Sequence, residues 1–212
     1  MKPKIVFFDC DGVINSGEVW KKINKVAKLP QALNKLWFDQ YYKNIITNEQ
    51  WIKNLSGYYK KYLTKIGFEK AILAGIKINP EIYKVLEILK KKNIKVAIIS
   101  SGLEDYVKII ANKLGIKEYR VNAIFSFDEL GNFKKFDYYS DDPIAKINQI
   151  KEICLVLDIN PEETYFVGDS FNDIKAFELT KHGILYKTKD PKITKFAWKM
   201  INNLEEIIES IS

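Results

Sequence analysis

Histidine, arginine and cysteine are scarce in this 212-residue sequence, and their scarcity excludes several kinds of site. His182, in the stretch "TKHGIL", is the only histidine, so the chain alone cannot build a histidine-rich zinc site, a Ser-His-Asp triad or a Cys-His dyad. We interpret it as a solvated loop residue before a strand. Cys10 and Cys154 lie far apart without metal-ligand spacing, which predicts two buried thiols and no disulfide. Chemistry must therefore rely on carboxylates, lysines, hydroxyls or a bound metal.

Long apolar runs are also missing. None reaches the roughly eighteen residues that a membrane helix requires, and Asp9 interrupts the first apolar stretch before it could act as a signal sequence. The hydrophobic fraction of 47% is still high enough for a folded core. The sequence therefore predicts a cytoplasmic protein with no membrane partner, built as one domain with an insertion.

Basic residues are abundant, but almost all of them are lysines. The formal net charge is +7, and Arg120 is the only arginine. Nucleic-acid phosphates and bases are commonly recognised by arginine forks, whereas these lysines are spread along the chain. We therefore expect no nucleic-acid partner, and a positive field that helps to attract a small anionic substrate.

Apolar strands and amphipathic helices alternate over most of the chain. This order predicts an α/β fold, in which helices sandwich a parallel sheet and the crossovers are right-handed. The expected strands lie at 4–8, 94–100, 164–168 and 183–187, and the expected helices at 79–93, 103–115, 141–158, 173–180 and 202–211.

Two segments interrupt the alternation. Residues 17–75 show helical periodicity without a convincing strand and are too long for an ordinary loop. We interpret 17–75 as a helical cap domain on a core domain formed by 1–16 and 76–212, and expect its tryptophans mainly in the core. Residues 121–139 alternate around the turn "DELGN", which predicts a small β-hairpin.

Acidic and hydroxyl side chains follow three of the expected strands. Ligands of open parallel sheets bind outside the carboxyl ends of the strands, so these side chains should meet at one edge. Asp9 and Asp11 point to the same side of an extended segment and would repel each other unless a cation lies between them. A polar turn explains the pair equally well. The residues concerned are Asp9, Asp11, Ser100, Ser101, Asp169, Asn172 and Asp173.

Together these motifs resemble those of the haloacid dehalogenase superfamily of phosphohydrolases, whose core is a Rossmann-like sheet. "FFDCDGV" matches the aspartate pair after the first strand, "VAIIS" the strand that ends in a hydroxyl, and "GDSFND" the acidic loop. Lys146 lies 23 residues before Asp169, a spacing similar to that of the phosphoserine phosphatase branch.

The resemblance implies a role for each matching residue. Asp9 would be the nucleophile that forms an aspartyl-phosphate, and Asp11 the general acid and base. Ser100 and Lys146 would stabilise the phosphate charge. The metal would be Mg²⁺, bound by Asp9, Asp169 and the backbone carbonyl of Asp11, with Asp173 behind them or through water. The implied substrate-binding residues are Ser101, Gly102, Asn172 and Glu18, whose position matches an acid that holds the amine of phosphoserine.

The leading hypothesis is a magnesium-dependent phosphatase of a small phosphorylated metabolite. A phosphoserine phosphatase proper, a phosphomutase of the same superfamily and a non-catalytic phosphate-binding module are the alternatives. Residues 17–75 contain no arginine. A lysine cannot reproduce the two-point grip of a guanidinium on a carboxylate, so we expect phosphoserine to be a poor substrate. The sequence leaves the oligomeric state open.

Overall fold

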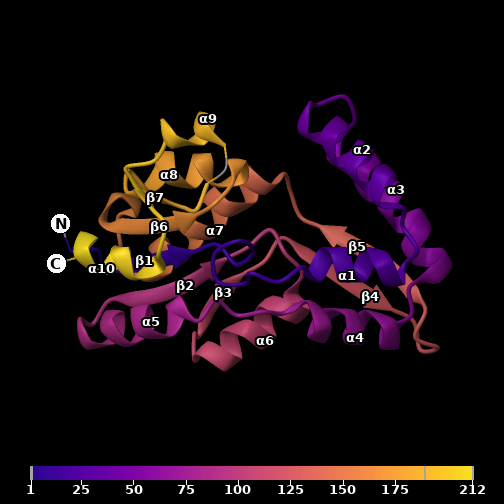
Figure 1. Cartoon of the computed structure of the whole chain (residues 1–212), viewed down its shortest axis with the longest axis horizontal. Helices are drawn as coiled ribbons and strands as arrows, with labels where there is room; N and C mark the ends of the chain where they lie inside the picture. Colours follow the sequence, from indigo (N-terminus) through magenta and orange to yellow (C-terminus); the bar gives the residue numbers. More distant parts are fainter. Residues whose placement is uncertain (1, 189, 212) are drawn as a thin grey trace.

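A six-stranded parallel sheet organises one half of the molecule (Figure 1). The computed structural model describes residues 2–188 and 190–211. The strand order is β3-β2-β1-β6-β7-β8, which confirms the predicted α/β fold. The strands are β1 (Ile5–Phe8), β2 (Lys95–Ile99), β3 (Glu118–Arg120), β6 (Thr164–Gly168), β7 (Gly183–Tyr186) and β8 (Lys199–Ile201).

The first strand is apolar throughout because helices cover both faces of the sheet. Val6 and Phe8 belong to a core shared with α5 (Glu81–Lys91) and α6 (Glu104–Leu114). Ile5 and Phe7 belong to the opposite core, shared with α7 (Asp142–Val156) and α8 (Ile174–Thr180). All four side chains have no exposed surface. The side chains of β1 thus alternate between the two cores. This central position of β1 places Asp9, which follows the strand, at the carboxyl edge of the sheet.

A second group of elements lies at the other end of the molecule (Figure 1). It consists of an antiparallel hairpin and four helices, whose aromatic side chains pack together. Phe125 of the hairpin stacks on Phe68 at 5.3 Å between ring centroids and contacts Tyr59 at 5.1 Å. The hairpin therefore covers an apolar face that the helices alone would leave exposed. The elements are α1 (Val19–Val26), α2 (Gln31–Tyr42), α3 (Asn48–Tyr62), α4 (Lys65–Gly75), β4 (Ala123–Phe127) and β5 (Phe133–Tyr138).

The structure differs from the sequence-based expectations at three places. The strands β3 and β8 were not expected, because each has only three residues and lies at an edge of the sheet. Instead of one closing helix over 202–211 there are two short turns, Leu204–Glu206 and α10 (Ile207–Ser210). His182 lies in the loop before β7, as expected, but it is only partly exposed, because its ring stacks on Tyr165 at 5.0 Å. The remaining short helices are Pro161–Glu163, Phe171–Asp173 and α9 (Pro191–Thr194).

Two predictions from the scarce residues can be compared with the fold. Cys10 and Cys154 are both buried and free, as expected. Among the described residues, no helix combines the length and the apolar character needed to span a bilayer. The boundaries of the cap domain, 17–75, stay a prediction.

Candidate active site

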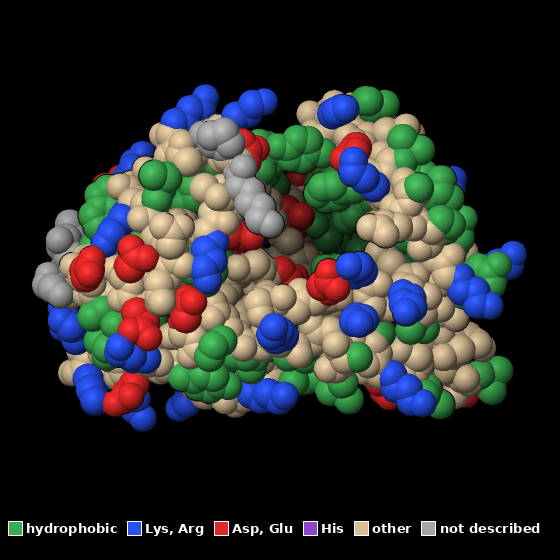
Figure 2. Space-filling view, in the orientation of Figure 1, with side chains coloured by type: hydrophobic (Ala, Val, Ile, Leu, Met, Phe, Trp, Pro, Cys, Tyr) green, Lys and Arg blue, Asp and Glu red, His purple; other side chains and the backbone are tan. Residues whose placement is uncertain are grey.

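A cavity of about 390 Å³ lies between the carboxyl ends of β1, β2 and β6 and the helices α1–α3. Figure 2 shows the surface hollowed there, with acidic side chains inside. One side, which we call the strand-end wall, consists of Asp9, Asp11, Gly12, Ser100, Ser101, Gly102, Asp169, Ser170 and Asn172. The other, the aromatic wall, consists of Trp20, Asn24, Asn34, Phe38, Trp51, Leu55, Tyr59 and Tyr138. Asp142, at the start of α7, completes the lining.

Three carboxylates and one lysine gather at the strand-end wall. Oxygens of Asp9, Asp169 and Asp173 all lie within 4.8 Å of one another. Lys146 reaches them from α7 and has no exposed surface. Its Nζ lies 2.6 Å from Oδ1 of Asp173 and 3.0 Å from Oδ2 of Asp9. The lysine chosen by spacing alone therefore meets the acids that it was expected to accompany.

The charges of this cluster are not balanced by the lysine. Burial raises the pKa of Asp9 well above its usual value, although Lys146 opposes the shift. Burial, together with the charge of Asp173, raises the pKa of Asp169 to about 7. Burial alone would lower the pKa of Lys146, but Asp173 and Asp9 outweigh it and raise that pKa. Positive charge in addition to Lys146 would favour ionised Asp9 and Asp169, and a set of carboxylate oxygens fits the preference of Mg²⁺.

Gly12 allows the two acidic loops to approach each other. Its φ is +81°, a left-handed conformation that glycine adopts without strain. A Cβ at this position would lie 2.0 Å from Oδ2 of Asp169. Glycine is therefore required here both by the backbone conformation and by the space that Asp169 occupies.

Asp11 is held by two side chains that the sequence analysis did not identify. Asn15 donates a hydrogen bond from Nδ2 to Oδ1 of Asp11 at 2.9 Å, and the hydroxyl of Tyr106 donates to Oδ2. Burial raises the pKa of Asp11, while these two hydrogen bonds lower it and leave a net rise. A carboxyl group with a raised pKa holds its proton more readily, as a general acid must.

Asn15 also connects Asp11 to the chain segments that lead into the helical part. It has no exposed surface. Its Oδ1 accepts hydrogen bonds from the backbone N–H of Gly17 at 3.1 Å and of Lys77 at 2.8 Å. One amide group therefore contacts the first and the last residues of the segment that contains α1–α4, and Asp11 as well.

The remaining expected residues divide into two groups. Ser100 is buried, and its Oγ accepts a hydrogen bond from the N–H of Gly102 at 2.9 Å. Asn172 donates to Oγ of Ser101 at 3.2 Å. These four residues line the cavity, as the sequence suggested. Glu18 does not: it is exposed, and its carboxylate pairs with Lys21 at 2.8 Å.

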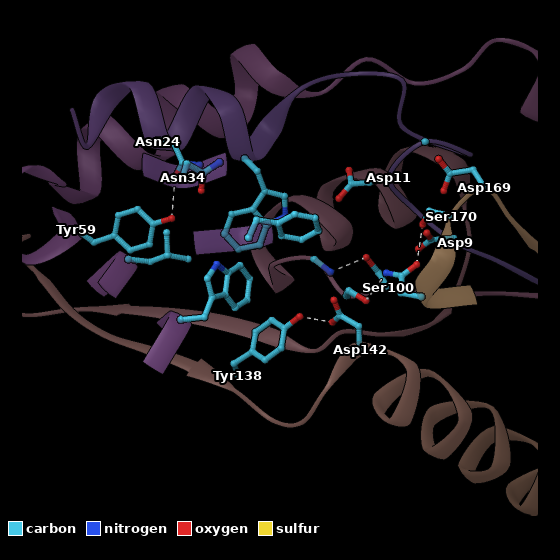
Figure 3. Close-up of a pocket in the computed structure, with 18 residues that line it drawn as sticks. Asp9, Asp11, Asn24, Asn34, Tyr59, Ser100, Tyr138, Asp142, Asp169 and Ser170 are labelled. Atoms are coloured by element: carbon cyan, nitrogen blue, oxygen red, sulfur yellow. Dashed lines mark hydrogen bonds between the residues drawn. The ribbon is translucent and has the colours of Figure 1, made fainter. Parts of the chain in front are cut away.

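The residues of the aromatic wall were missed as candidates, because the tryptophans of 17–75 were expected in the core. A signal was present, since Trp51, Leu55 and Tyr59 recur every four residues and so share one face of α3. Tyr59 donates from its hydroxyl to Oδ1 of Asn24 at 2.7 Å. In Figure 3, Asn24, Asn34 and Tyr59 lie across the cavity from Asp9, Asp169 and Ser170.

Trp51 and Asp142 show how this side of the cavity is built. The Trp51 ring stacks on Tyr41 at 5.0 Å and meets the edge of Tyr138 at 5.7 Å. Its indole N–H has no hydrogen-bond partner among the described residues. Oδ1 of Asp142 accepts hydrogen bonds from Asn122 at 3.0 Å and from the hydroxyl of Tyr138.

Comparisons with known proteins agree with this geometry. The family model for haloacid dehalogenase-like hydrolases matches residues 3–179. The chain is 29% identical to a phosphoglycolate phosphatase of Aquifex aeolicus, over 82% of this chain and 79% of that protein. It is 25% identical to a phosphoserine phosphatase of Methanocaldococcus jannaschii, over 84% of this chain and 82% of that protein. A solved phospho-aspartyl intermediate analogue of phosphoserine phosphatase has the same fold, with a TM-score of 0.84, 24% identity and full coverage of both chains.

Proposed function

We propose a reaction for this chain, which belongs to the haloacid dehalogenase-like hydrolases and is a phosphoric monoester hydrolase. In this proposal it hydrolyses a small phosphorylated metabolite through an aspartyl-phosphate on Asp9. The observation that carries this proposal is the group of Asp9, Asp169, Asp173 and buried Lys146, placed at the strand ends below a cavity. A carboxylate nucleophile divides hydrolysis into two displacements, each easier than direct attack by water.

Mg²⁺ is the metal that we propose for this group of acids. The side chains of Asp9 and Asp169 and the backbone carbonyl of Asp11 would hold it, and Asp173 would support them from its buried position. When bound, the ion neutralises charge on the phosphate oxygens. The raised pKa values of Asp9 and Asp169 support the proposal, because a bound cation would offset the burial that raises them.

The proposed reaction uses the two aspartates of the first motif in turn. An Oδ of Asp9 forms a bond to phosphorus, the ester P–O bond breaks, and Asp11 donates its proton to the departing alkoxide. Asp11 then takes a proton from water as the water oxygen attacks phosphorus, and the bond between phosphorus and Asp9 breaks. Phosphate leaves, and both aspartates return to their starting states.

Other residues of the strand-end wall would bind the phosphate. Ser100 would donate its hydroxyl to a phosphate oxygen, and Ser101, Gly102 and Asn172 would contact the same group. Lys146 would offset the charge of Asp9 and of the phosphate while it holds Asp173. In this proposal the strand-end wall binds the part that all phosphate esters share, and the aromatic wall binds the alcohol.

The names of the relatives direct attention to phosphoglycolate and phosphoserine, which both carry a carboxylate. No lysine or arginine lines the cavity in the part of the chain that the structure describes. Glu18, the residue expected to hold the amine of phosphoserine, lies outside the lining and pairs with Lys21. We therefore propose that phosphoserine is a poor substrate and that the protein acts on another small ester. We also propose that it acts in the cytoplasm.

Phosphate release from p-nitrophenyl phosphate tests the proposed function, because this ester has a good leaving group and needs little recognition of its alcohol. We expect turnover with Mg²⁺, almost none after chelation, and stoichiometric free phosphate. Full activity in chelator would contradict the metal site. Phosphoryl transfer to a second substrate without free phosphate would indicate a mutase, and phosphate binding without turnover a binding module.

A further inference from the structure

Asp142 adds a carboxylate to the side of the cavity that would receive the alcohol, where the described residues supply no lysine or arginine. Asp142 lines the cavity, and its Oδ1 accepts hydrogen bonds from neutral groups of Asn122 and Tyr138. Within the described residues, no lysine or arginine lines the cavity, and Lys146 is engaged by Asp9 and Asp173 beneath the strand ends. In Figure 3, Asp142 lies across the cavity from Asp11, joined to Tyr138 by a hydrogen bond. A group attached to a phosphate at the strand ends can therefore lie near this carboxylate.

Aromatic rings surround the same space. Trp20, Phe38, Trp51 and Tyr138 all line the cavity. Trp51 is fixed in place by Tyr41 on its face and by Phe38, 6.4 Å away between ring centroids. Tyr41 is anchored in turn by a hydrogen bond from its hydroxyl to Asp141 at 3.2 Å. The rings are thus held by one another before any ligand arrives, which reduces the entropy lost on binding.

A cation is the group that would fit both the aromatic rings and the carboxylate of Asp142. The negative faces of aromatic rings attract cations, and quaternary ammonium groups are bound by such arrangements. We propose that the substrate is the phosphate ester of an amino alcohol with a quaternary ammonium group, as in phosphocholine. This ammonium group would lie among the aromatic rings beside Asp142. This inference rests on the proposed phosphatase activity and names its substrate class.

The same arrangement disfavours esters of acidic alcohols. A carboxylate or a second phosphate on the alcohol would face Asp142 and the ring faces, and it would find no basic partner among the residues that line the cavity. Phosphoserine carries both an amine and a carboxylate, so the gain from the first is opposed by the second. A cation without an accompanying carboxylate fits the lining better.

A pair of substrates with the same shape tests the inference. Phosphocholine is compared, with Mg²⁺, to its neutral isostere, in which a tert-butyl group replaces the trimethylammonium group. We expect kcat/KM to be at least about tenfold higher for phosphocholine. Asp142→Asn should reduce this ratio toward one. Asp158→Asn is the matched control, because Asp158 is an exposed acid just after α7 and does not line the cavity.

The outcomes separate the inference from the function on which it rests. If p-nitrophenyl phosphate is hydrolysed but phosphocholine is no better than its isostere, the substrate class is wrong and the phosphatase stands. A higher kcat/KM for phosphoserine than for phosphocholine also overturns the class. If none of these esters is hydrolysed, the proposed function and the inference both fail. Calorimetry provides a second measurement: choline should bind the wild type with an affinity about tenfold above that of its neutral carbon analogue, and equal affinities would overturn the inference.

Discussion

The two walls of the cavity are built in different ways. The strand-end wall is fixed by the ends of three parallel strands, and two of its acids, Asp9 and Asp169, lie within 4.8 Å of buried Asp173 beside Lys146. The aromatic wall comes mostly from three separate helices, and its members are held mainly by ring contacts. We therefore expect the strand-end wall to carry out the proposed reaction and the aromatic wall to select the substrate. Changes in the strand-end wall should impair every substrate, and changes in the aromatic wall only some.

The largest expected effect is that of Asp9→Asn. The amide is nearly the same size but is a poor nucleophile, so turnover should fall by at least about a thousandfold with every ester. The measurement is phosphate release from an aryl and an alkyl ester. Asp137→Asn on the hairpin, a partly exposed acid paired with Lys135, is the control and should keep its activity. Substantial turnover by the Asp9 variant would remove the distinction between the walls.

Lys146→Met should reduce stability as well as activity. The change leaves buried Asp9 and Asp173 without the cation that both now contact. Breaking a buried ion pair in this way lowers the free energy of unfolding by about 3 kcal/mol or more. Urea denaturation in chelator measures the loss. Lys151→Met, an exposed position on the same helix, should change the stability little, and equal losses in the two variants would contradict the role of the buried lysine.

Asp11→Asn should discriminate between leaving groups. An alkyl alkoxide needs a proton as it departs, whereas p-nitrophenolate does not, so the alkyl ester should lose about a hundredfold and the aryl ester much less. The comparison of kcat/KM for the two esters checks this. Equal losses would show that Asp11 acts in some way other than as the acid.

Trp51→Leu should affect only substrates that reach the aromatic wall. We expect kcat/KM for an ester with a cationic alcohol to fall by about tenfold, while acetyl phosphate, which has no cationic group, changes little. Trp37→Leu is the control, since Trp37 packs on Tyr58 at 6.0 Å and does not line the cavity. A comparable loss with acetyl phosphate would show that the two walls are not independent.

The smallest expected effect is a dependence of stability on pH in the metal-free protein. Burial raises the pKa of Asp169 to about 7, far above its value in the unfolded chain. The folded protein therefore holds a proton that the unfolded chain loses, so this stabilisation is complete below about pH 4 and is lost as the pH rises through 7. In chelator, the melting temperature should fall by several degrees between about pH 5 and pH 8. Mg²⁺ should raise it more at the higher pH, and a rise of the melting temperature with pH in chelator would contradict the assignment.

The sequence predicted the strand-end wall far better than the aromatic wall. Asp9, Asp11 and Asp169 lie in short contiguous motifs next to strands, so the local pattern was enough to place them. Lys146 required only a spacing along the chain. Tyr106 reaches Asp11 from α6, and Trp51 reaches the cavity from α3, and both positions depend on how helices pack in three dimensions. The three-residue edge strands were missed for a similar reason, because their pairing partners rather than their own residues define them.

The buried amide of Asn15 links Asp11, the proposed general acid, to both chain segments that connect α1–α4 with the sheet. The helical segment leaves the sheet near Gly17 and returns near Lys77, and these two backbone positions are the ones that Asn15 holds while it also holds Asp11. A movement of α1–α4 relative to the sheet would therefore also move the side chain of Asn15. Opening the cavity to release an alcohol would then turn the proton donor away from the phosphate, and closing it would bring the donor back. Opening and closing of the cavity would thus control when the proton is transferred.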